Sequence, residues 1–255
     1  MPQPWDQFLP GFALAIFRLG AMFMAVPLLG PVQVPRRMKL VLAAAMTLAM
    51  GPVIGPVTLP QDPFALAVGI GGELVFGVAL GASVSLVFVA VHWAGQIIGQ
   101  QMGLDLGEVF DPQFGDGSSL IGRTYVLLAL AVFFAVRGHH GLIGGVAGSF
   151  EAVPLLAAGT GVNIVNLLVS LLTAATGLAL QLAVPMLVSV LVVDLLLALL
   201  GRTMPQLNVL SAGLSLRVGL GLVVLIAGLA LSSEIIRQAL LEGVQKMNLA
   251  WKRGL

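Results

Sequence analysis

The chain has 255 residues, of which 58% are hydrophobic and only 9% are charged, and its mean hydropathy is +1.06. Soluble domains carry about 25% charged residues, so this composition excludes an ordinary water-soluble fold and is typical of a polytopic membrane protein. The net charge of +1 argues against nucleic-acid binding, because no basic surface exists to neutralise phosphates. The absence of cysteine excludes disulfides, thiolate metal sites and cysteine nucleophiles.

Six apolar stretches approach or exceed the length of about 20 residues that a helix needs to cross a bilayer. They are residues 8–30, 39–59, 63–104, 121–137, 162–201 and 205–232. The third and fifth stretches are about twice that length, so each is either one long helix or a helical hairpin. Pro185 predicts a kink in the fifth, because proline lacks the backbone N–H of a regular helix. The sequence therefore predicts an all-α membrane protein of long, kinked helices and helical hairpins.

The charged residues between these stretches conflict with a simple count of six spans. Arg36, Arg37 and Lys39 place the first loop in the cytoplasm, and the basic C-terminal tail indicates the same side. Asp6 and Asp62 fit the periplasm, and six crossings that begin there would also end there. We therefore expect at least one re-entrant hairpin, or helices that do not all cross lipid. The N-terminus lacks the basic start of a signal peptide, so the first apolar stretch is expected to be retained.

The C-terminal tail has the pattern of an amphipathic helix. Its apolar residues recur at helical spacing, and they are Ile236, Leu240, Val244, Met247 and Trp251. We expect this helix to lie on the membrane or on a partner, with specific docking as the alternative.

Glycines recur every fourth residue at Gly95, Gly99 and Gly103, beside the polar amides of Gln96 and Gln100. On a helix such a repeat makes a flat strip that lets a neighbouring backbone approach closely. The amides would be costly against lipid, so they should face another helix or an aqueous lumen. We expect an inter-helix or intersubunit contact, and simple packing within the chain is the alternative.

Four ionisable residues lie inside apolar stretches. Each costs at least about 2.5–3.5 kcal/mol at the centre of a bilayer, so each needs a partner, a wet cavity or neutralisation. We expect ion pairs that fix assembly, and a proton relay is the alternative. These four residues are Arg18, Glu73, Asp194 and Arg217.

An acidic segment at 105–119 separates two apolar stretches and is rich in glycine, so it cannot continue as a regular helix. The residue pattern of a calcium loop is absent. Two phenylalanines favour a mobile loop that inserts aromatic side chains into a constriction, and a plain periplasmic connector is the alternative. The candidate residues are Asp105, Glu108, Phe110, Asp111, Pro112, Phe114 and Asp116.

Nothing in the sequence predicts catalysis, a metal site or a cofactor. His139 and His140 are adjacent, so on a helix they would point about 100° apart and make a poor pair of metal ligands. The zinc-protease pattern H-E-x-x-H is absent, as are a phosphate-binding glycine loop and a nucleophile elbow. We therefore expect a protein that is not an enzyme.

An ordered set of motifs resembles the FliR family of type III secretion export-gate proteins. The run A-G-Q-I-I-G-Q-Q-M-G-L at 94–104 is followed by F-D-P at 110–112, and G-H at 138–139 leads to S-F at 149–150 and Pro154. The motifs A-V-P at 183–185 and P-Q-L-N-V at 205–209 resemble the C-terminal half of the family, as do Asp194 and Arg202. The likeness spans nearly the whole chain.

This resemblance implies a core subunit of the flagellar export gate in the bacterial inner membrane, within the flagellar basal body. Such proteins assemble with FliP and FliQ into a closed channel for unfolded flagellar proteins, beside FlhB and FlhA, and bind no cofactor. Residues 1–160 would be a FliP-like part and residues 161–255 a FliQ-like hairpin part with an amphipathic tail. The loop at 105–119 would be a plug within the channel.

Three other functions remain open at this point. Glu73 or Asp194 could couple protons to a small substrate in a secondary transporter. The chain could also be the equivalent subunit of a virulence injectisome. An intramembrane enzyme is the third alternative, and it lacks any catalytic arrangement in the sequence.

Overall fold

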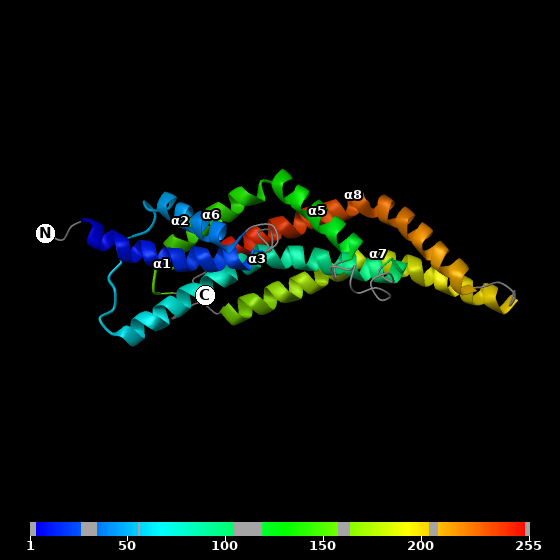
Figure 1. Cartoon of the computed structure of the whole chain (residues 1–255), viewed down its shortest axis with the longest axis horizontal. Helices are drawn as coiled ribbons and strands as arrows, with labels where there is room; N and C mark the ends of the chain where they lie inside the picture. The colour runs from blue at the N-terminus through cyan, green and yellow to red at the C-terminus, as the bar shows by residue number, and fades with distance from the viewer. Residues whose placement is uncertain are drawn as a thin grey trace. The chain divides into compact units, whose positions relative to one another are not determined.

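A computed structural model describes residues 4–26, 35–55, 57–104, 119–157, 164–203 and 209–252. Within these ranges the regular structure is entirely helical and contains no strand, which confirms the all-α prediction (Figure 1). The helices are α1 (Pro4–Ala25), α2 (Arg36–Ala49), α3 (Pro63–Met102), α5 (Leu120–Ala135), α6 (Gly138–Ala152), α7 (Ile164–Thr203) and α8 (Val209–Lys252).

Among the described residues, four helices are long and apolar enough to cross a membrane. They lie in α1, α3, α7 and α8. A fifth span is possible if α5 and α6 count as one, because these two helices meet at a 69° bend across a short break. Arg137 in this break has a left-handed backbone, with φ 54°. The bent pair is a candidate for the re-entrant segment that the charge pattern led us to expect.

The two stretches of double length are single helices rather than hairpins. Both α3 and α7 have 40 residues, and α8 has 44. Pro185 lies inside α7 without ending it. The helix that we expected in the C-terminal tail is the continuous end of α8.

One predicted span was wrong, and one helix was missed. Among its described residues, the one helix in the stretch 39–59 is α2, whose 14 residues would cover about 21 Å, too short to span a bilayer. This helix ends at Ala49 because Gly51, Pro52 and Gly55 follow, and neither glycine nor proline favours a continued helix. The missed helix is α6, which was not predicted as an apolar helix because five glycines lower its apolar content.

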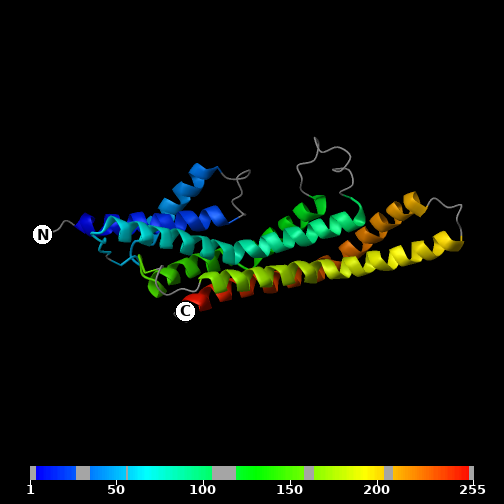
Figure 2. The ribbon, with the colours of Figure 1, turned by 90° about the horizontal axis from the view of Figure 1, so that it is seen from below.

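The helices group into two compact units, and α3, α7 and α8 each contribute to both. Unit 1 consists of Met1–Leu86, Val136–Thr173 and Leu240–Leu255. Its buried core draws on α1, α2, α3, α6 and the start of α7, and α1 runs beside the first part of α3 (Figures 1 and 2). Core members include Leu19, Phe76, Leu80, Phe150 and Leu171.

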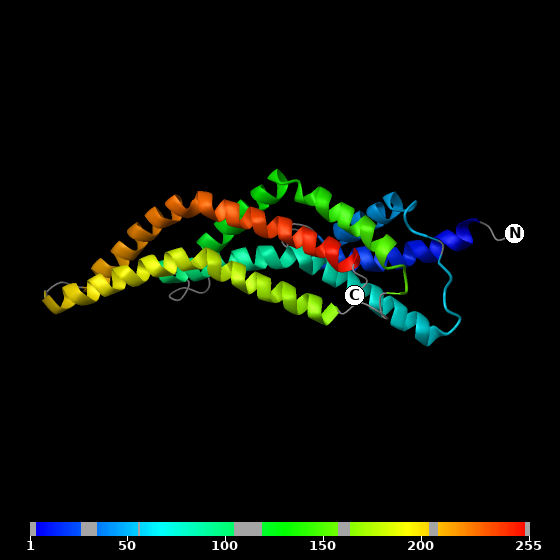
Figure 3. The ribbon, with the colours of Figure 1, turned by 180° about the vertical axis from the view of Figure 1, so that it is seen from behind.

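Unit 2 consists of Val87–Ala135 and Ala174–Ala239. Within it, the later part of α7 and the first part of α8 run antiparallel, as Figure 3 shows in yellow and orange. Phe88 on α3 packs edge-on against Phe133 on α5, with ring centroids 5.8 Å apart. Each unit contains one pair of the charged residues that lie inside apolar stretches.

Candidate functional site

The most enclosed polar site of unit 1 joins Arg18 on α1 to Glu73 on α3. Both side chains are fully buried. Arg18 Nε donates to Glu73 Oε2 at 2.6 Å, and Nη2 donates to Oε1 at 3.1 Å. This two-pronged geometry is the strong form of an arginine–carboxylate pair. The structure therefore gives Arg18 the partner that its position in an apolar helix requires.

Arg18 also binds the end of α6. Its Nη1 donates to the carbonyl oxygens of Ser149 at 3.2 Å and Val153 at 3.1 Å. Ser149 O also accepts from the Val153 N–H at 3.0 Å. The carbonyls at the end of a helix carry partial negative charge, so a cation there is favourable. The guanidinium carbon also lies 4.6 Å from the ring centre of Phe76 and 4.8 Å from that of Phe150.

Glu73 completes the arrangement by holding the turn after α6. The backbone N–H of Leu156 donates to Glu73 Oε1 at 2.8 Å. Leu156 has a left-handed backbone with φ 68°, which is uncommon for a residue with a side chain. Arg18 and Glu73 thus tie α1, α3 and the turn after α6 together, and we call this set the 18–73 clamp.

Glycines on α3 let α1 come close enough to form the clamp. A Cβ atom on Gly77 would overlap the carbonyl oxygen of Arg18, and one on Gly81 would lie 2.6 Å from that of Met22. Any larger side chain at these two positions would force the helices apart. This is the close approach that glycines four residues apart permit between membrane helices.

In unit 2 the structure pairs Asp194 on α7 with Arg217 on α8. Arg217 Nη2 lies 2.6 Å from Asp194 Oδ1, and Nε donates to the same oxygen at 2.7 Å. The side chains are 38% and 40% exposed, unlike the fully buried clamp. The four charged residues singled out in the sequence therefore form two separate pairs, and their role in assembly remains a prediction.

The glycine repeat at the end of α3 has two different surroundings. A Cβ atom on Gly95 would lie 2.6 Å from the Cα atom of Gly122, so α3 and α5 pack closely within this chain. Gly103 lies just beyond α3 with φ 77°, where it ends the helix. Leu104 N–H donates to Gly99 O and Gly103 N–H to Gln100 O, the hydrogen-bond pattern of a Schellman motif.

Gly95 thus makes a contact between two helices of this chain, and Gly103 has a capping role that spacing alone did not suggest. Contacts of this strip with another subunit remain a prediction.

The acidic loop lies outside the described residues. This holds for all seven of its candidate residues, which are Asp105, Glu108, Phe110, Asp111, Pro112, Phe114 and Asp116. The described residues stop at Leu104 before this loop and resume at Ser119 after it. The plug assignment therefore stays a prediction.

No group of three or more histidines, aspartates and glutamates among the described residues could hold a metal ion. The rings of His139 and His140 lie 4.4 Å apart in an edge-on arrangement at the start of α6.

Sequence reasoning missed most of the groups around the two charged pairs. The carbonyls of Ser149 and Val153 and the amide of Leu156 leave no trace in side-chain chemistry. Phe76 could have been found, because it lies one turn after Glu73 on the same helix face.

Comparison with known proteins decides the family. The model of the family described as bacterial export proteins, family 1, matches residues 9–243. The chain belongs to this family. It is 30% identical to the flagellar biosynthetic protein FliR of Bacillus subtilis, over 89% of each chain. It is 32% identical to FliR of Escherichia coli, over 86% of this chain and 85% of that protein.

The FliR of Aquifex aeolicus is 28% identical over 89% of this chain and 88% of its own length. These findings confirm the resemblance to FliR and identify the chain as a component of the flagellar export apparatus. Its apolar helices, together with these relatives, indicate a flagellar membrane protein.

Proposed function

We propose that this chain is a core subunit of the closed gate through which unfolded flagellar proteins leave the cell. In this proposal it assembles with FliP-type and FliQ-type subunits, next to FlhB-type and FlhA-type proteins, in the inner membrane at the flagellar basal body. It performs no catalysis and needs no cofactor. The relatives named FliR support the flagellar setting over a virulence injectisome.

The observation that carries this proposal is the length of the apolar helices. A helix of 40 residues is about 60 Å long, whereas the hydrocarbon core of a bilayer is about 30 Å thick. About half of α3, α7 and α8 must therefore lie outside the hydrocarbon. The candidate spans in these helices nevertheless cover 33 to 40 residues each, so their outer parts need a protein cover rather than water.

The exposure of each helix within the chain indicates which helices another protein would have to cover. The most apolar window of α3 is 67% buried, whereas those of α7 and α8 are only 28% and 6% buried. Lipid can cover the part inside the bilayer. Neighbouring export-gate subunits of similar apolar character are the cover that we propose for the remainder.

The acidic loop at 105–119 is proposed to be the plug of the gate. Phe110 and Phe114 would fill the lumen at rest, and the glycines would let the loop withdraw when a substrate arrives. Deleting residues 110–117 should make cells leak small solutes while flagellar export continues. Unchanged permeability in an assembled complex would remove this assignment.

The division into a FliP-like part at 1–160 and a FliQ-like part at 161–255 is also a proposal. The 18–73 clamp holds residues 149–156, directly before the proposed join. The clamp would thus stabilise the FliP-like part through contacts within it, before the long α7–α8 hairpin begins.

Co-purification separates the gate from a secondary transporter. The tagged chain, expressed with its FliP-type and FliQ-type neighbours, should be recovered with both after detergent extraction and size-exclusion chromatography. Purified alone in liposomes, it should show no ion-coupled uptake of a small solute. Recovery as a stable lone monomer with such uptake would contradict the proposal.

A further inference from the structure

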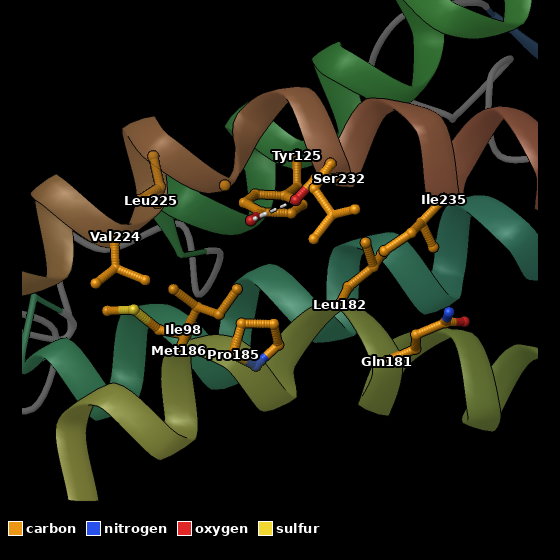
Figure 4. Close-up of a pocket in the computed structure, with 12 residues that line it drawn as sticks. Ile98, Tyr125, Gln181, Leu182, Pro185, Met186, Val224, Leu225, Ser232 and Ile235 are labelled. Atoms are coloured by element: carbon orange, nitrogen blue, oxygen red, sulfur yellow. Dashed lines mark hydrogen bonds between the residues drawn. The ribbon is translucent and has the colours of Figure 1, made fainter. Parts of the chain in front are cut away.

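Unit 2 has a small, partly open cavity between α7 and α8, to which α3 contributes Ile98 and α5 contributes Tyr125 (Figure 4). Its volume is about 40 Å³. A water molecule needs about 10–15 Å³ measured in this way, so the space suits about three. The lining is mainly apolar, and its polar groups come from Tyr125, Ser232 and Gln181.

The hydroxyl groups of Tyr125 and Ser232 face each other in this cavity, as the dashed line in Figure 4 shows. Their oxygens are 3.4 Å apart, longer than the usual 2.7–2.8 Å of such a bond. Both residues are almost completely buried, at 4% and 6% exposure. The pair is therefore a weak hydrogen bond in apolar surroundings.

The single hydrogen bond between the Tyr125 and Ser232 hydroxyls leaves one of their two protons without an acceptor. Each hydroxyl has one proton to donate and two lone pairs, and their single contact uses only one of the two protons. Other serines of this chain donate to a carbonyl three or four residues earlier in their own helix. Examples are Ser83, Ser85, Ser149, Ser170, Ser189 and Ser233.

Ser232 makes no such bond within the described part of the chain, where its hydrogen bond is the one to Tyr125. The remaining proton of the pair therefore calls for an acceptor from outside the protein.

Pro185 supplies that cavity with a further polar group. Proline has no backbone N–H, so the carbonyl of Gln181, four residues earlier on α7, loses its regular helical donor. Both residues line the cavity. A carbonyl without its donor is costly in an apolar environment, and bound water is one of the ways in which proline positions in membrane helices are satisfied.

We propose that this cavity binds a small cluster of water molecules at the proline position of α7. The water accepts the spare hydroxyl proton of the Tyr125–Ser232 pair and donates to the Gln181 carbonyl. Because water exchanges partners easily, the hydrated site lets α7 change its bend at Pro185 without leaving a polar group unpaired. An alkyl chain of lipid, the competing occupant, could satisfy neither group.

Hydrogen–deuterium exchange of a single thiol tests this site. The chain has no cysteine, so Ser232→Cys gives a single S–H infrared band, and its loss in D₂O reports contact with water. The control is Ser83→Cys, because Ser83 is 1% exposed and its hydroxyl bonds Ala79 O at 3.0 Å within its own helix. Both full-length variants are measured in lipid nanodiscs.

The thiol of Ser232→Cys should exchange at least about tenfold faster than that of Ser83→Cys, since a hydrated thiol needs no local opening. A smaller difference overturns the proposal. If Ser232→Cys does not fold, Gly228→Cys decides by the same threshold, because Gly228 lines the cavity and an added Cβ meets no atom within 4 Å. Neither result depends on export, so failure here leaves the gate proposal standing.

Discussion

Arg18 is buried in a membrane protein, yet the structure surrounds it with acceptors and aromatic rings. Glu73 provides charge, two carbonyls at the end of α6 accept from Nη1, and two phenylalanine rings lie over the guanidinium. Breaking a buried pair by removing one partner is costly because it leaves the other charge without compensation. The 18–73 clamp should therefore tolerate little change.

Glu73→Gln should lower the free energy of unfolding by about 3–5 kcal/mol, since it leaves the Arg18 charge buried and uncompensated. Thermal unfolding of the purified complex measures this effect. Glu234→Gln is the matched control, because Glu234 pairs with Arg237 while its side chain is 47% exposed. It should change stability little. Equal melting temperatures for the two variants would contradict a structural role of the clamp.

The pair of Asp194 and Arg217 allows a different experiment, because both side chains reach the surface of unit 2. Asp194→Arg and Arg217→Asp should each reduce swarming motility, since each places two like charges together. The double exchange should restore most of the motility. If the double variant swarms no better than the single ones, the two charges face separate partners and their contact within the chain is incidental.

At the scale of the helices, glycine has two separate uses in α3. At Gly77 the backbone of α3 contacts the backbone of α1. At Gly71, on the same helix, an added Cβ atom would meet no other atom within 4 Å. The same substitution should therefore have opposite effects at these two positions.

Gly77→Ala should reduce the amount of folded protein in membranes, because its methyl group would overlap the Arg18 carbonyl. Gly71→Ala should be neutral or stabilising, by up to about 1 kcal/mol, because alanine favours a helix more than glycine does. Membrane protein levels and thermal unfolding compare the two. Similar losses from both would show that close packing of α1 on α3 is not the reason for Gly77.

The end of α3 uses glycine for its backbone conformation. Gly103 has φ 77°, which costs about 1–2 kcal/mol for most residues with a side chain. Gly103→Ala should destabilise the helix end by about that amount, and Gly103→Asn by less, because asparagine adopts this conformation more readily. Thermal unfolding ranks the three proteins, and an equal loss for alanine and asparagine would contradict the capping role.

The sequence predicted the long helices well, because each is a continuous apolar run. It could not choose between one helix and a hairpin at 63–104, since glycines weaken a helix without necessarily ending it. It also failed at 39–59, where apolar residues continue beyond Gly51 and Pro52 although α2 ends at Ala49. The charged residues could be identified from the free-energy cost of a charge in the bilayer. Their pairing could not, because it depends on which helices lie side by side.

At the scale of the whole molecule, the exposed apolar helices need neighbours. Ile226 on α8 is 66% exposed within this chain, although it lies in one of the most apolar helices. Phe133, by contrast, is 3% exposed and packs against Phe88. These two positions can report whether protein covers the outer face of α8.

A photo-reactive benzoyl-phenylalanine at Ile226 should form cross-links to another subunit in intact cells, because we expect protein to cover this face. Benzoyl-phenylalanine in place of Phe133 should give no cross-link between chains, because this side chain is buried within the chain. Gel mobility and mass spectrometry identify the products. Cross-links of Ile226 to lipid alone would contradict the assembly that we propose.

The 18–73 clamp has a consequence for how the protein is made. Arg18 and Glu73 are 55 residues apart, so the first helix leaves the ribosome well before its counter-charge has been synthesised. During that interval the arginine cannot be released into hydrocarbon at low cost. We expect α1 to wait beside the insertion machinery until α3 arrives, so that the two helices enter the lipid as a neutral pair.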